Sequence, residues 1–134
     1  MTTINEARET VYERVRALWT DTVFTFEGDD FDEPESDPWL RVSVRQRGGG
    51  QSTLGGVGNR RFRREASVHG QLFVPLKEGL KQNDTLAKTF NDLFEGVPRI
   101  SGLEFGDGRI SEIGPSGNKQ QHGVEIEFSY QERK

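Results

Sequence analysis

The residues whose types and spacing could do chemistry lie first in a glycine-rich segment near the middle of the chain. Gly50 and Gly55 have the spacing of a phosphate-binding loop, but Gly56 and Val57 stand where that motif needs Lys and Ser/Thr. The motif fails without a lysine to reach the phosphates and a hydroxyl to hold magnesium. A dinucleotide-binding GxGxxG pattern starting at Gly56 also fails, because Arg61 replaces its third glycine and a strand follows. We therefore expect no nucleotide site in this segment.

Carboxylates and histidines are the next candidates for chemistry. A calcium-binding EF-hand loop needs a glycine at its sixth position, and counted from Asp30 that position holds Glu35. The two histidines, His69 and His122, belong to no metal-ligand or nucleophile pattern, and no serine lies in a nucleophile elbow. We interpret both histidines as exposed residues of strands or loops. The sequence predicts no enzyme, no metal site and no cofactor.

Charge is gathered in two blocks of opposite sign, although the net charge is only −4. Residues 27–37 carry acids and no base, whereas residues 41–64 carry arginines and no acid. The densest part of the basic block is Arg60, Arg61, Arg63 and Arg64. These arginines could track phosphates, but no aromatic residues alternate with them as in proteins that bind single strands. One reading is a solvated loop beside a basic sheet face; the other is two surfaces that meet another copy or a charged partner.

Composition indicates one domain, residues 1–134, with a modest core and long solvated loops. Hydrophobic residues make up 31% of the chain, charged residues 30%, and there are 16 glycines and no cysteine. The lack of cysteine rules out a disulfide framework and fits assembly in a reducing compartment. No apolar run approaches the ~18 residues of a membrane span, and the charged N-terminal residues are unlike a signal peptide.

The element that organises the chain is a long strand followed by a helix. From Phe62 to Val74 the even positions are mostly apolar and the odd ones mostly polar, which is the pattern of a strand with one buried face. Pairing should stop at Pro75, because proline has no amide hydrogen to donate. Apolar residues then recur at helical spacing as far as Val97, and Gly96 and Pro98 end this helix: Leu86, Ala87, Phe90, Leu93, Phe94 and Val97.

The other elements are shorter. Thr3 and Glu6 have capping-box spacing at the start of a first helix that reaches Trp19. Strands are expected at residues 23–26, 39–45, 100–105, 109–113 and 124–130, with an acidic loop at 27–38, a flexible loop at 46–59, a hairpin turn at 106–108 and a loop at 114–118. The sequence thus predicts an α+β domain: a mixed, mainly antiparallel β-sheet with two helices packed on one face.

Several short segments carry a resemblance to a known family. They are Pro38-Trp39-Leu40-Arg41-Val42, Gly70-Gln71-Leu72-Phe73-Val74-Pro75, Phe90-Asn91-Asp92-Leu93-Phe94 and the last strand, 124–130. Together with the order of elements, they resemble the small tail terminator and tail-completion proteins of long-tailed bacteriophages, over nearly the whole chain.

The resemblance implies a tail-terminator/tail-tube-like fold and a structural virion protein. Such a protein forms a ring, commonly a hexamer, that caps the tail tube, stops its polymerisation and provides the head–tail joining surface. Its partners would be further copies of itself, the tail tube protein and a head–tail connector or neck protein, in a virion tail assembled in the host cytoplasm. No membrane and no specific nucleic acid are expected. A neck or head-completion connector and a basic-patch nucleic-acid-binding module stay open as alternatives, with a small-molecule enzyme as the least supported.

Contact residues follow in the same way. In tube-like relatives a long loop between strands mediates stacking, a role that the resemblance assigns to residues 46–59, with contacts at Gln51, Ser52, Thr53 and Leu54. For contacts within a ring, we expect the acidic residues Asp29, Asp30 and Asp32 to face the arginine block, Arg60, Arg61, Arg63 and Arg64, of a neighbouring copy.

Overall fold

The computed structural model describes residues 2–34, 37–76 and 80–133. Glu35, which belongs to the predicted acidic loop, lies outside these residues. The elements in chain order are α1 (Ile4–Leu18), β1 (Val23–Phe26), β2 (Trp39–Gln51), β3 (Arg61–Pro75), α2 (Leu80–Asp92), β4 (Glu104–Ser116) and β5 (Lys119–Arg133). No helix in the described residues is long and apolar enough to cross a membrane.

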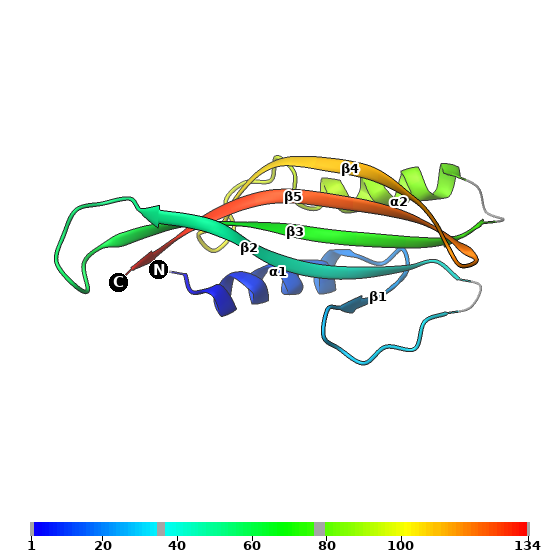
Figure 1. Cartoon of the computed structure of the whole chain (residues 1–134), viewed down its shortest axis with the longest axis horizontal. Helices are drawn as coiled ribbons and strands as arrows, with labels where there is room; N and C mark the ends of the chain where they lie inside the picture. The colour runs from blue at the N-terminus through cyan, green and yellow to red at the C-terminus, as the bar shows by residue number, and fades with distance from the viewer. Residues whose placement is uncertain (1, 35–36, 77–79, 134) are drawn as a thin grey trace.

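The five strands form a single sheet in the order β1-β2-β3-β5-β4 (Figure 1). Only β1 and β2 run parallel, and every other neighbouring pair is antiparallel. The prediction of an α+β domain with a mixed, mainly antiparallel sheet is confirmed. The strand predicted from Phe62 onward is the central one, and its pairing does end at Pro75, which lies opposite Lys119.

Both helices pack on the same face of the sheet and share one core. The even-numbered residues of β3 point into it, as their period of two predicted: Ala66, Val68, Leu72 and Val74 are at most 1% exposed. The rings of Trp19, just after α1, and Phe90, on α2, meet edge to face with centroids 5.9 Å apart. Helix α1 begins as expected, because the Thr3 side chain accepts a hydrogen bond from the Glu6 amide.

One glycine of β3 sets how closely α2 approaches the sheet. A Cβ atom at Gly70 would lie only 2.5 Å from the ring of Phe90. Phe90 is fully buried, so its ring occupies the space above the strand that a side chain at position 70 would need. The helix therefore rests directly on the backbone of the central strand.

The predicted flexible loop at 46–59 is wrong in its first half. Strand β2 continues to Gln51, which pairs with Phe62, and the register shifts between Gln46 and Gly48. Gly49 has a φ of +140°, and a Cβ atom there would come within 1.9 Å of the Arg63 carbonyl oxygen. Glycine is needed at this bulge for close approach of the two backbones, so its presence signals pairing rather than disorder.

Three features of the second half of the chain also differ from the prediction. Residues 106–108 form no hairpin turn but an irregularity within β4, where the register shifts between Phe105 and Gly108; the reversal to β5 comes at Gly117 and Asn118. Ile100 lies outside β4 and makes only a bridge with Leu103. Helix α2 ends at Asp92 and not near Val97, since the amides of Leu93 and Phe94 bond to carbonyls three residues back and tighten the turn.

Candidate assembly surfaces

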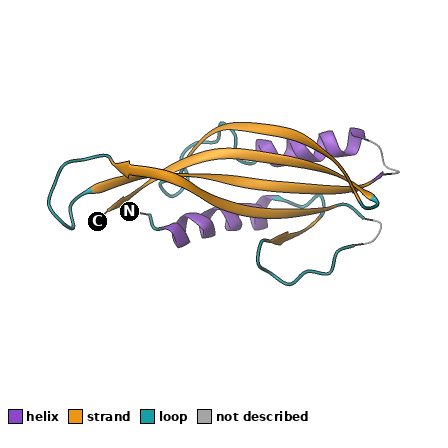
Figure 2. Cartoon of the chain, in the orientation of Figure 1, coloured by secondary structure: helices purple, strands orange, loops and turns teal. Residues whose placement is uncertain are grey.

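The loop that joins β2 to β3 projects beyond the end of the sheet (Figure 2), where β5 still accompanies β3 as far as Arg61, opposite Arg133. Its base is fixed by hydrogen bonds: the Ser52 amide donates to the Arg61 carbonyl at 2.8 Å, and the Arg61 amide donates to Thr53 Oγ1 at 2.9 Å. At its end Leu54 is 96% exposed and Val57 is 87% exposed. We call residues 52–60 the hairpin tip. The predicted contact residues Ser52 and Thr53 hold the tip together, whereas Leu54 is free to meet a partner.

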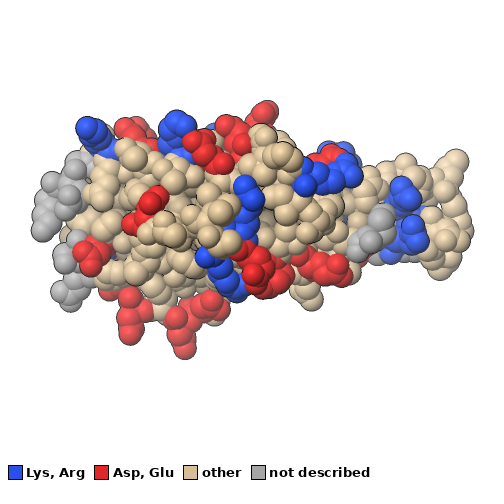
Figure 3. Space-filling model, turned by 180° about the vertical axis from the view of Figure 1, so that it is seen from behind, with Lys and Arg blue, Asp and Glu red and all other residues tan. Residues whose placement is uncertain are grey.

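The predicted arginine block is split by its contacts within the chain. Arg64 pairs with Glu132 at 2.9 Å and Arg63 with Glu65 at 3.5 Å. Within the described part of the chain, Arg60 and Arg61 form no ion pair. Figure 3 shows the uncharged end of the hairpin with positive side chains just inside it. The charge available to a partner is therefore concentrated next to the tip.

The acidic loop lies toward the other end of the molecule, away from the hairpin tip (Figure 1). Asp29, Asp30 and Asp32 are exposed, and the ion pairs that the described residues form with the arginine block of the same chain involve Glu65 and Glu132 instead. The loop is anchored by Lys119, which is 1% exposed and donates hydrogen bonds to the carbonyl oxygens of Pro34 and, at 2.9 Å, Asp37. Sequence analysis missed Lys119, because its acceptors lie more than 80 residues earlier in the chain.

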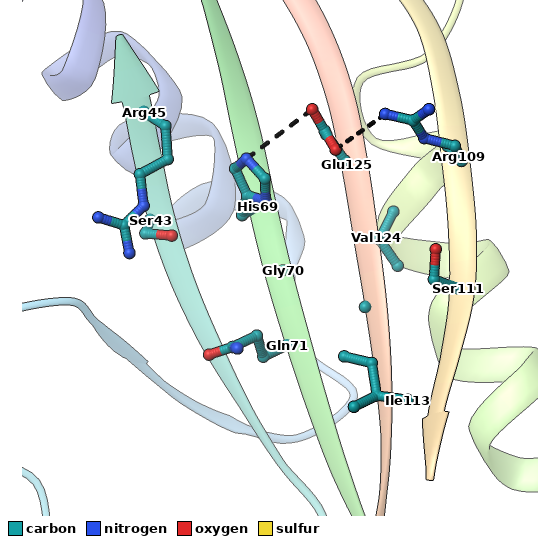
Figure 4. Close-up of a pocket in the computed structure, with 11 residues that line it drawn as sticks. Ser43, Arg45, His69, Gly70, Gln71, Arg109, Ser111, Ile113, Val124 and Glu125 are labelled. Atoms are coloured by element: carbon teal, nitrogen blue, oxygen red, sulfur yellow. Dashed lines mark hydrogen bonds and ion pairs between the residues drawn. The ribbon is translucent and has the colours of Figure 1, made fainter. Parts of the chain in front are cut away.

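The sheet face opposite the helices carries a shallow pocket of about 240 Å³ (Figure 4). At its centre Glu125 lies between His69, 4.0 Å from Nε2, and Arg109, 3.1 Å from a guanidinium nitrogen. Burial is the main cause that lowers the pKa of His69 below its ordinary value of 6.5. Arg47 also holds Glu125, at 2.6 Å, so this carboxylate is neutralised by cations.

His69 and Glu125 of this pocket, with the buried Ser67 beside them, do not make a catalytic triad. Ser67 Oγ lies 2.9 Å from His69 Nε2, which is also the ring nitrogen nearest to Glu125. In a triad the carboxylate bonds one ring nitrogen and orients the ring, which leaves the opposite nitrogen free to take the proton of the nucleophile. Ser67 is also fully buried and cannot reach a substrate. The arrangement links strands β3, β5 and β4 through charge.

His122 is fully buried, so the expectation that both histidines are exposed is wrong. It faces α2, where its Nε2 lies 3.2 Å from Asp84 Oδ1, and donor atoms of Asp84, Glu112 and His122 all lie within 4.8 Å of one another. An imidazole and two carboxylates are ligands that a divalent cation accepts. The hydrogen bond to Asp84 accounts for the position of the ring without an ion. The alternation of β5 could have predicted this burial, because His122 falls on the same face of the strand as Val124.

A further hollow, of about 710 Å³, runs along the outer side of α1. We call it the α1 groove. Its acidic side chains are Glu6, Glu9 and Glu13, and its apolar ones are Ala17, Leu18 and Ile100. Leu18 is 48% exposed and so presents apolar surface to solvent. The sequence pattern of α1 predicts one buried face and does not reveal this groove. Its apolar surface is completed by Ile100, which comes from a turn far along the chain.

Comparison with known proteins adds structural similarity only. No known protein family matches the sequence, and no curated protein sequence does. Among solved structures 25 chains are similar. One of them, whose name states no function, superposes with a TM-score of 0.57 over 94% of this chain and 89% of that chain, at 15% sequence identity. At this identity the likeness shows the shared fold alone.

Proposed function

We propose that this chain is a structural protein of a bacteriophage tail, a terminator that forms a ring on the end of the tail tube. The ring stops polymerisation of the tube and offers its outer surface to a head–tail connector or neck protein. The resemblance of the sequence to tail terminator and tail-completion proteins suggests this role, and the shape of the chain supports it. The observation that carries it is the projecting hairpin tip, whose exposed side chains have no covering element in the described chain.

A closed ring needs two different surfaces on each subunit, because each copy meets its neighbours in a head-to-tail manner. The chain offers a tip flanked by Arg60 and Arg61, which form no ion pair with the described residues, and acidic surfaces on other elements. The predicted contact of Asp29, Asp30 and Asp32 with the neighbour's arginines stays a prediction. Because Arg63 and Arg64 are already paired within the chain, Arg61 is the member of the block best suited to it.

The geometry of the candidate chemical groups favours a structural role over catalysis. The pocket on the open sheet face holds a glutamate neutralised by arginines, and the serine that contacts its histidine, Ser67, is buried. These side chains connect strands, and none of them presents an unshared base to a substrate.

The test is to mix the purified protein with purified tail tubes under conditions in which tubes still grow. We expect capped tubes that stop elongating, seen by negative-stain microscopy, and rings of about six subunits at the tube ends. Tubes that elongate equally with and without the protein would overturn the proposal. Binding to isolated heads or portals and not to tubes would instead support the neck-protein alternative, and salt-sensitive DNA binding lost in Arg60→Ala/Arg61→Ala would support a nucleic-acid-binding module.

A further inference from the structure

The hairpin tip combines exposed apolar side chains with nearby positive charge. Leu54 and Val57 are almost completely exposed, and no described side chain covers them. Hydrogen bonds at Ser52 and Thr53 fix the base of the loop, so the tip is presented on a preorganised arm. Arg60 and Arg61 follow directly in the chain. A matching acceptor needs an apolar floor with acidic side chains around it.

The α1 groove has this composition. Ala17, Leu18 and Ile100 supply an apolar floor, while Glu6, Glu9 and Glu13 line the same hollow with carboxylates. Arg16 pairs with Glu9 and Glu13, each at 2.8 Å, so one guanidinium is shared by two carboxylates there. Among the described residues Glu6 has no ion pair and bonds only near its own helix start. Arg14 also lines the groove and donates a hydrogen bond to the Leu93 carbonyl. The three carboxylates still outnumber the guanidinium groups of Arg14 and Arg16, so the groove keeps a small negative excess.

We propose that the hairpin tip of one copy docks into the α1 groove of a second copy of this chain. Leu54 and Val57 cover the apolar floor, and Arg60 and Arg61 face the glutamates of α1. The acidic loop is a less suitable acceptor, because Lys119 draws part of it onto the sheet.

The contact joins different surfaces of the two copies, so each docked copy keeps a free tip and a free groove for the next one. This is the heterologous contact from which rings are built. The inference deepens the proposed function. It rests on that function only in assuming that successive docked copies close into a ring on a tube. Contact between two copies is a separate claim that can be measured without tubes.

The absence of cysteine from the sequence allows a clean crosslinking test on the full chain. Leu54→Cys in one preparation is mixed with Leu18→Cys in another, and the pair is oxidised. The matched control replaces the second partner by Val23→Cys, since Val23 is 52% exposed on β1 and lies outside the groove. We expect the tip–groove disulfide to form at least about tenfold faster than the control, because docking raises the effective concentration of the two thiols. Equal rates would overturn the inference.

Charge reversal tests the same contact without new thiols. Arg60→Glu/Arg61→Glu and Glu6→Arg/Glu13→Arg should each lose self-association in sedimentation velocity, and an equimolar mixture of the two should regain paired copies, because the reversed tip then meets a reversed groove. Recovery with a reversed acidic loop in place of the reversed groove would show that the loop is the acceptor and would overturn the inference.

Combining these results with the tube assay separates the two proposals. A protein that caps tubes but gives no tip–groove crosslink refutes the docking contact and leaves the terminator function standing. A protein that crosslinks through tip and groove but does not cap tubes supports the contact and refutes the terminator function. Circular dichroism of each variant confirms that the fold is retained before either result is used.

Discussion

Replacing Gly70 by alanine is the sharpest test of the core. The new Cβ atom would lie 2.5 Å from the Phe90 ring, with two further ring carbons at 2.8 and 2.9 Å. Real Cβ atoms do not tolerate such contacts, so α2 or the ring has to move. The ring has little room, because it is fully buried and packs against both Trp19 and Phe94. The strain therefore falls on the contact between α2 and the sheet.

The size of the effect follows from two opposing terms. Overpacking a core costs about 1–3 kcal/mol, while exchanging a strand glycine for alanine returns about 0.5–1 kcal/mol of chain entropy. We expect Gly70→Ala to lower the free energy of unfolding by about 0.5–2 kcal/mol, or the melting temperature by about 2–8 °C.

The control is Gly50→Ala on β2, where a Cβ atom would meet nothing within 4 Å. This variant should keep only the favourable entropy term. Urea denaturation of both variants would then separate them by about 1–3 kcal/mol. A Gly70→Ala protein as stable as Gly50→Ala would refute the close approach of Phe90. Adding Phe90→Leu should cost less in the Gly70→Ala background than in the parent chain, because the smaller side chain relieves the clash.

Two further perturbations probe the anchored loop and the open sheet face. Lys119→Met removes the hydrogen bonds to the Pro34 and Asp37 carbonyls and should speed cleavage of the acidic loop by a Glu-specific protease about tenfold or more. The control is Lys88→Met, at an exposed position. Equal cleavage rates for the two variants would contradict the anchoring role of Lys119. Because burial lowers the pKa of His69, the unfolded state takes up its proton first as the pH falls below 6.5, so stability decreases from there toward lower pH. His69→Gln should show a smaller drop in melting temperature between about pH 7.5 and about pH 5.5 than the parent chain, and an identical drop would contradict the assignment.

Periodicity in the sequence was enough to predict the elements that bury one face. The even positions of β3 from Ala66 onward are buried, and the capping-box pair at Thr3 and Glu6 marks the start of α1 correctly. Both patterns are local, because each depends only on residues two or three positions apart in the sequence. The fold class followed from these elements and was predicted correctly.

Glycine-rich segments were the main source of error in the fold. Residues 46–51 and 106–108 look alike as loops in composition, yet each lies in a strand with a shift of register. What distinguishes a bulge from a turn is the partner strand, such as the Arg63 carbonyl that excludes a side chain at Gly49. That information lies elsewhere in the chain and cannot be read from a window of sequence.

The candidate surfaces were predictable only in part. The sequence identified an apolar residue, Leu54, in a loop beside arginines, and the structure shows how exposed it is. It did not reveal that Arg64 is paired with Glu132, because that pair depends on the register between β3 and β5. The α1 groove was missed for the same reason, since Ile100 joins the helix only in the folded chain.

Substitutions at the hairpin tip and substitutions at the bulge of Gly48 and Gly49 would have different consequences during evolution. Substitutions at Leu54 or Val57 alter what the arm can bind and leave the core untouched, because neither side chain contacts it. Substitutions at Gly49 alter the direction in which the arm leaves the sheet, since any side chain there must push against the Arg63 backbone. The binding specificity of the tip and the direction of the hairpin can therefore change independently. Related proteins could bind a new partner after a few substitutions at the tip, while the direction of the hairpin is kept.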